Sequence, residues 1–202
     1  PKFARELFTG MAGMNRVFQG AATVDSILRG NTIEYAAAAG LRSLFVGFET
    51  LSPRGLAGAG KRQNLGRDYL EVIRRLDDLG IMINGSFVFG MDGDDESAFA
   101  RTVDWAIAHG VETATFHVLT PYPETPLFRE LDGARRIVHR DWRLYDTAHV
   151  VFDPALMTAE QLFAGYQWCY RRLFSHRSIW RRRPRDWRAV LPYLAMSYLY
   201  KR

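Results

Sequence analysis

Cysteine is almost absent from this sequence, since Cys169 is the only one among 202 residues. A single thiol excludes an intrachain disulfide and a cysteine-rich metal site, which fits a reducing, cytoplasmic setting. The sequence also lacks a signal peptide and any apolar run near the ~18 residues that a membrane-spanning helix needs. Its composition, 48% apolar and 24% charged, is typical of a globular protein with a real core.

The net charge of +5 is unevenly spread, because much of the excess lies in "RRLFSHRSIWRRRPRDWR", residues 171–188. Two interpretations are open: a solvated basic surface, or a contact with anionic lipid headgroups or phosphate. The interleaved Trp180 and Trp187 and the apolar residues 189–200 favour lipid over nucleic acid within the second interpretation. We therefore expect a peripheral membrane contact through this tail and no nucleic-acid partner.

Apolar runs of strand length alternate with segments of helical period over the first 132 residues. Such alternation indicates parallel strands joined by right-handed crossovers, and four units predict an α/β fold that is the C-terminal part of a partial (βα) TIM-like barrel. The expected strands are 16–25, 42–50, 81–90 and 112–120, and the expected helices are near 31–40, 66–80, 94–110 and 127–131. In the second of these helices the apolar stripe is expected to be Leu70, Ile73 and Leu76 with Tyr69.

The pattern changes near residue 133, where an aromatic and irregular stretch begins. A helix then starts at a capping box formed by Thr158 and Gln161, and Cys169 lies on its apolar face as a buried core thiol. We divide the chain into barrel residues 1–132, a helical C-terminal extension 133–183 that packs back on the sheet, and a basic and apolar tail 184–202.

In this architecture ligands bind at the carboxyl ends of the strands. Glu49 and Thr50 follow a buried run, and a buried carboxylate needs a partner. That partner is either a cation of the chain, such as Arg42 or Lys61, or a ligand amine or ribose hydroxyl.

The third strand ends in "NGSFVFGMDGDDES", residues 84–97. Gly90 lets a backbone approach a ligand, but the acids that follow would repel phosphate and are expected to cap the next helix. The strand itself has no feature that opposes a flat aromatic ligand. The fourth strand carries His117, which is either a core residue or a site residue, and a rigid proline-braced turn, residues 120–126, follows it.

Other chemistry finds no support. The sequence has no Gly-x-Ser-x-Gly elbow, no HExxH pair and no P-loop, and its five histidines are scattered. A phosphate-binding barrel enzyme would need basic or glycine-rich turns. The residues alone therefore indicate an α/β enzyme fragment that binds a neutral or zwitterionic ligand.

Several segments together resemble the radical S-adenosylmethionine (SAM) superfamily, in its branch with a cobalamin-binding domain that includes hopanoid methylase-like enzymes. The resemblance covers about residues 17–183 and is carried by the order and spacing of these segments: "RSLFVGFETLSP", "KRQN", "GIMINGSFVFGMDGDDESAFARTVDWA", "ETATFHVLTPYPETPLF" and "HRDWRLYDTAHVVF".

This resemblance implies a barrel that holds SAM and a [4Fe–4S] cluster. It places Glu49 against the methionyl or ribose part of SAM, with Thr50 beside it. It places the third strand beside the adenine, through Gly85, Ser86, Phe87 and Gly90. It places the turn after the fourth strand on the adenosine or substrate side, through His117, Leu119 and Tyr122. Members of the family commonly have glycine where this chain has Glu124, which either shifts the loop or faces solvent.

The cluster-binding CxxxCxxC loop is missing, and Cys169 lies too late in the chain to replace it. The chain begins with Pro1 inside a helical pattern, so we expect a piece of a longer protein, with cluster and cobalamin both ligated by residues outside this chain. The predicted function is radical-based methyl transfer, or a related modification, of an apolar lipid-like or tetrapyrrole-like small molecule. The alternative is a non-catalytic α/β binding module that has lost the cluster.

Overall fold

The computed structural model describes residues 2–51 and 69–201. Its centre is a four-stranded parallel sheet in the order β1-β2-β3-β4. The strands are β1 (Phe18–Thr23), β2 (Leu41–Glu49), β3 (Met82–Phe89) and β4 (Thr113–Val118). Each strand lies beside the next one in the sequence, as successive crossovers of one hand require. The α/β class and the four strands are therefore confirmed, and closure into a barrel stays a prediction.

The helices between the strands follow from their apolar periodicity. They are α2 (Val24–Leu28), α3 (Thr32–Ala38), α5 (Tyr69–Asp78) and α6 (Ser97–Ala108), and α1 (Lys2–Met11) precedes them. In α5 the buried residues are Val72, Ile73 and Leu76. The prediction that Leu70 belongs to this stripe is wrong, because its side chain is 39% exposed. The short helix α2 was not predicted.

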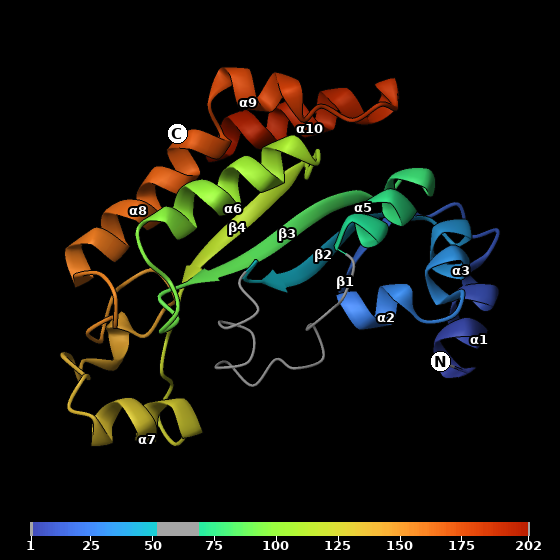
Figure 1. Cartoon of the computed structure of the whole chain (residues 1–202). Helices are drawn as coiled ribbons and strands as arrows, with labels where there is room; N and C mark the ends of the chain where they lie inside the picture. The colour runs from blue at the N-terminus through green and yellow to red at the C-terminus, as the bar shows by residue number, and fades with distance from the viewer. Residues whose placement is uncertain (1, 52–68, 202) are drawn as a thin grey trace.

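The two faces of the sheet differ in chemistry. Strand alternation places Val46 and Phe48 of β2 and Phe87 and Phe89 of β3 on one face, where all four are buried beneath helices. Figure 1 shows α6 and α8 (Ala159–Leu173) running along this side of β3 and β4, and both helices contact the sheet.

The second face, which we name the polar face, carries smaller and more polar side chains. Its members are Phe45, Gly47 and Glu49 of β2, Asn84, Ser86 and Val88 of β3, and Thr113, Thr115 and His117 of β4. Because α6 and α8 lie along the other face (Figure 1), the polar face is the candidate surface for a ligand.

The C-terminal extension closes the outer edge of β4. The Tyr170 hydroxyl of α8 accepts a hydrogen bond from the Phe116 N–H (3.0 Å) and donates one to the Phe116 carbonyl (3.1 Å). A strand edge left open would expose a row of unpaired backbone groups. The predicted capping box of Thr158 and Gln161 is confirmed, and so is the packing of this extension against the sheet. The domain boundaries stay predictions.

Two short helices and a tail helix complete the chain. They are α7 (Pro126–Gly133), which Figure 1 shows on the opposite side of the sheet from α6, and α9 (His176–Arg181) and α10 (Trp187–Tyr200). Tyr193 anchors α10, because it is buried and its hydroxyl donates to the Ile179 carbonyl at 2.7 Å. Among the described residues no helix combines the length and the apolar character needed to cross a bilayer.

Not every arginine of the basic segment, residues 171–188, lies on the surface. Arg182 is 1% exposed and donates to the carbonyls of Val111, Glu112 and Leu173. Neither sequence interpretation of this segment, as a solvated surface or as a lipid contact, fits Arg182, which is a structural residue. Arg181 and Arg183 on either side of it are exposed.

Candidate functional site

Glu49 ends β2 and turns its carboxylate back over the polar face. It has φ +66°, and the sheet register shifts between Gly47 and Glu49. A β-carbon placed on Gly47 would come within 2.8 Å of Glu49 Oε1, so the carboxylate occupies the space above this glycine. Gly47 therefore leaves free the space that the Glu49 carboxylate occupies. This role of Gly47 was not predicted, although a glycine two residues before a strand-end acid was a usable signal.

Residues near Glu49 hold the carboxyl end of β2 in place. The Tyr69 hydroxyl of α5 donates to the Phe48 carbonyl at 2.9 Å, and burial together with the nearby Glu49 charge raises the pKa of Tyr69 to about 12. Tyr69 therefore stays protonated at neutral pH. Thr50 is buried. Of the two proposed cationic partners, Arg42 directs its guanidinium to the carbonyls of Ala37 and Leu41, and Lys61 lies outside the described residues.

His117 lies across the polar face from Glu49, on β4. Its Nδ1 is 3.2 Å from Thr147 Oγ1, and its Nε2 is 3.3 Å from Thr115 Oγ1. Burial lowers the pKa of His117, and the Glu49 charge opposes this shift. The imidazole is therefore neutral at neutral pH. Thr115 and Thr147 were not predicted, and Thr147 is separated from His117 by thirty residues, so spacing carried no signal.

Between Glu49 and His117 the polar face is lined by neutral polar groups. Gly47 pairs in register with Ser86, and Ser86 pairs with Thr115, so these positions form one row across three strands. One step along β3, Asn84 Oδ1 is buried without a hydrogen-bond partner among the described residues. The row itself presents the uncharged hydroxyl groups of Ser86 and Thr115 and therefore suits a neutral or zwitterionic ligand.

Gly85 and Phe87 lie on the opposite, helix-covered face. A β-carbon on Gly85 would meet Phe87 at 3.1 Å and Phe48 at 3.2 Å, and the rings of Phe48 and Phe87 stack at 5.5 Å. The space beside Gly90 is likewise filled, by Leu162 and Phe152. Core side chains therefore fill the space where a side chain of Gly85 or Gly90 would lie, and the contact of these glycines with an adenine stays a prediction.

The acids after β3 do more than cap a helix. Asp94 is buried and accepts from the N–H groups of Gly90 and Met91 at 3.1 Å each, and so it holds the turn itself. Asp92 pairs with Arg136 at 2.7 Å. The expectation that these acids cap α6 is wrong for Asp92 and Asp94, and Glu96 at the N-cap position makes no side-chain capping bond; only Asp95 accepts from a backbone N–H of the helix, that of Ser97.

The turn after β4 is anchored to β3. The Leu119 N–H donates to the Phe89 carbonyl at 2.8 Å, while Tyr122 is 47% exposed. Glu124 is exposed and has φ +64°, the left-handed conformation that glycine adopts most readily. Of the two alternatives for Glu124, the structure supports the one in which it faces solvent.

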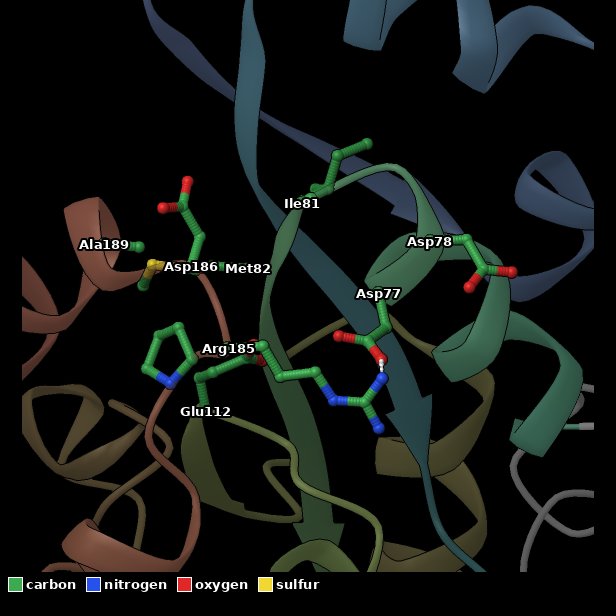
Figure 2. Close-up of a pocket in the computed structure, with 10 residues that line it drawn as sticks. Asp77, Asp78, Ile81, Met82, Glu112, Arg185, Asp186 and Ala189 are labelled. Carbon is green, nitrogen blue, oxygen red and sulfur yellow. Dashed lines mark ion pairs between the residues drawn. The ribbon is translucent and has the colours of Figure 1, made fainter.

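A cavity of about 140 Å³ lies at the other end of the strands, away from Glu49 and His117. It is formed where the start of β3 meets the segment before α10, and Figure 2 shows the ion pair of Arg185 and Asp77 at its mouth. Burial raises the pKa of Glu112, one of its lining residues, to about 7. The cavity therefore marks the docking of the tail onto the sheet, and it is separate from the polar face.

The described residues contain no group of three or more His, Cys, Asp or Glu side chains arranged to hold a metal. Cys169 is buried on α8, and burial raises the pKa of its thiol. The prediction of a buried core thiol is confirmed. A [4Fe–4S] cluster needs several thiolates together, so this chain does not fit as the ligand set for a cluster.

Comparisons with known proteins agree with this reading of the fold. Over 190 residues the chain is 32% identical to the bacteriochlorophyllide d C-12(1)-methyltransferase of Chlorobaculum tepidum, and the match covers 93% of this chain and 41% of that protein. Over 161 residues it is 26% identical to the hopanoid C-2 methylase of Rhodopseudomonas palustris, covering 80% of this chain and 29% of that protein. No protein-family model matches the chain.

A solved structure gives the same fold. The radical S-adenosylmethionine methyltransferase TsrM from Kitasatospora setae, with cobalamin and a [4Fe–4S] cluster bound, superposes with a TM-score of 0.54 at 21% identity. The superposition covers 66% of this chain and 28% of that chain. The chain is thus similar over most of its length to methyltransferases and methylases of bacteriochlorophyllide and hopanoid compounds, and it shares the fold of a radical SAM methyltransferase, so the resemblance predicted from the sequence is confirmed. It spans less than half the length of the relatives it matches.

Proposed function

We propose that this chain is the SAM-binding part of a cobalamin-dependent radical SAM methyltransferase, and that SAM lies on its polar face. One observation carries the proposal: the Glu49 carboxylate is folded over Gly47 at the carboxyl end of β2, on the polar face of a parallel sheet. Ligands of such sheets bind at the carboxyl ends of the strands. The named relatives are methyltransferases and methylases, which use a methyl donor.

The residues present fit SAM and do not fit its partner cofactors. A carboxylate complements the α-ammonium group or the ribose hydroxyls of SAM. Ser86 and Thr115 lie in the row between Glu49 and His117 and supply uncharged hydroxyl groups. A cluster and cobalamin, if bound, take their ligands from other residues of the full-length protein. Together these groups supply a radical or a transferable methyl group.

The substrate we propose is an apolar or tetrapyrrole-like small molecule. The named relatives act on bacteriochlorophyllide and hopanoid compounds. On this chain the substrate side is formed by neutral His117 and by Tyr122, whose ring is half exposed beyond the anchored Leu119. A neutral imidazole and an aromatic ring contact an apolar surface without the desolvation penalty of a charge.

The tail helix α10 contacts, in this proposal, a membrane that carries such a substrate. In α10 the only charged residue is Arg188, and Trp187, Leu191 and Leu199 are each at least 65% exposed. Exposed apolar side chains beside the cations at the end of α9 favour an anionic bilayer surface. Flotation with phosphatidylserine vesicles tests this contact. Leu191→Ala should reduce binding, and Leu70→Ala, which removes an exposed leucine far along the chain, should not.

Methyl transfer by the full-length protein tests the proposed function. The protein, purified without oxygen and supplied with cobalamin, should contain iron and sulfide and bind SAM. It should also move a labelled methyl group from SAM to a bacteriochlorophyllide or hopanoid substrate, as mass spectrometry would detect. Stable SAM binding with neither cluster nor methyl transfer would instead support the alternative, a binding module that has lost its cluster. Absence of SAM binding would refute both.

A further inference from the structure

A turn of the C-terminal extension reaches the edge of β4 beside His117. The Val118 N–H donates to the Thr147 carbonyl at 2.7 Å, and Thr147 Oγ1 lies 3.2 Å from His117 Nδ1. Thr147 therefore touches β4 twice, once through its backbone and once through its side chain. The turn belongs to the segment "HRDWRLYDTAHVVF", for which the proposed function gives no role.

Thr147 adopts a conformation that is unfavourable for its residue type. Its φ is +66°, and a β-branched side chain is strained in this left-handed region. Asp146 maintains the turn, because its carboxylate accepts from the N–H groups of Ala148 and His149 and lies 2.9 Å from His149 Nδ1. Glycine would fit the backbone with less strain. The threonine is explained by what its hydroxyl does.

The hydroxyls of Thr147 and Thr115 contact the two nitrogens of the His117 ring, one each. A neutral imidazole needs one donor and one acceptor, and a hydroxyl is able to serve as either. With both nitrogens engaged, the plane of the His117 ring is set by Thr147 and Thr115, whichever nitrogen carries the proton. A ring fixed in this way presents a constant edge toward the polar face.

We propose that Thr147 is a positioning residue that fixes the His117 ring on the polar face, so that the C-terminal extension completes the site. The inference rests on the proposed function in one respect only, namely that the polar face is where ligands bind. The contact between Thr147 and His117 stands independently of which ligand that is. The extension is then part of the site rather than a cover for the sheet edge.

Three variants of the full-length protein separate the hydroxyl from the fold. Thr147→Ser keeps the hydroxyl, Thr147→Val keeps the shape without it, and Thr147→Gly removes the hydroxyl and relieves the backbone strain. We expect Thr147→Gly to unfold at the same or a higher denaturant concentration than the parent. Its His117 ring nitrogens should nevertheless show altered NMR shifts, because Nδ1 loses the Thr147 hydroxyl as its hydrogen-bond partner.

Turnover provides the second readout. Loss of one positioning hydrogen bond, about 1–1.5 kcal/mol, should lower methyl transfer about tenfold in Thr147→Gly and Thr147→Val, mainly in kcat, while Thr147→Ser stays near the parent. Unchanged His117 nitrogen shifts in Thr147→Gly and Thr147→Val would overturn the proposal. So would unchanged turnover in a protein that does transfer methyl groups. Altered nitrogen shifts in a protein that never binds SAM would leave the positioning role standing and refute the proposed function instead.

Discussion

Arg182 provides a sharp test of how the tail is joined to the sheet. Its guanidinium is 1% exposed and donates to the carbonyls of Val111, Glu112 and Leu173 and to Ser178 Oγ. The substitution Arg182→Ala leaves three buried carbonyls without these donors, each worth about 1–3 kcal/mol. Removal of a buried charge recovers part of its desolvation penalty. The net loss should be about 3–5 kcal/mol, a large part of the ~5–15 kcal/mol that typically stabilises a domain.

Urea unfolding followed by tryptophan fluorescence measures this loss, and Arg181→Ala is the matched control. Arg181 is exposed, so its removal should change the free energy of unfolding by no more than about 0.5 kcal/mol. If the two variants unfold at the same urea concentration, Arg182 does not hold the tail to the sheet. In a membrane-binding experiment Arg181 is the residue to replace, since replacement of the buried Arg182 would alter the fold.

Two further predictions concern the core and the tail cavity. Burial raises the pKa of Glu112 from 4.5 to about 7, so the folded state should lose roughly 3 kcal/mol as the pH rises across this interval. Glu112→Gln should therefore raise the melting temperature near pH 8 and leave it unchanged near pH 4, and an equal effect at both pH values would contradict the assignment. A β-carbon on Gly165 would come within 2.2 Å of the Phe99 ring, whereas one on Gly133 would meet nothing within 4 Å. Gly165→Ala should thus lower the free energy of unfolding by more than about 1 kcal/mol, and Gly133→Ala should not; equal effects in urea would show that the ring moves aside freely.

The elements of this fold were predictable because their signals are local. Strand-length apolar runs and the capping box of Thr158 each depend on neighbouring residues, and all were found at the expected places. Leu70 was wrongly assigned to the buried stripe of α5. The buried residues are Val72, Ile73 and Leu76, and helical spacing allows a stripe with Leu70 as readily as one with Val72. Periodicity alone does not choose between two such registers, since tertiary packing decides.

The site was only partly predictable, because it is assembled from distant segments. Glu49 was found since an acid after a buried run requires an explanation. Strand alternation already placed Gly85 on the face of Phe87 and opposite Ser86, and its predicted contact with an adenine stays a prediction. Thr147 contacts His117 across thirty residues of sequence, and no spacing rule predicts such a contact. The burial of Arg182 was not predicted for the same reason, because its guanidinium binds carbonyls that are distant in the sequence, such as those of Val111 and Glu112.

Equilibrium binding of SAM to the full-length protein and to its Glu49→Gln variant tests the central claim most directly. The Glu49 carboxylate lies over Gly47, so Glu49→Gln should weaken SAM binding at least about tenfold, and Gly47→Ala, which displaces the carboxylate, should have a similar effect. Glu130→Gln, at an exposed position on α7, should bind SAM as the parent does. Unchanged affinity in both Glu49→Gln and Gly47→Ala would show that SAM does not bind on the polar face.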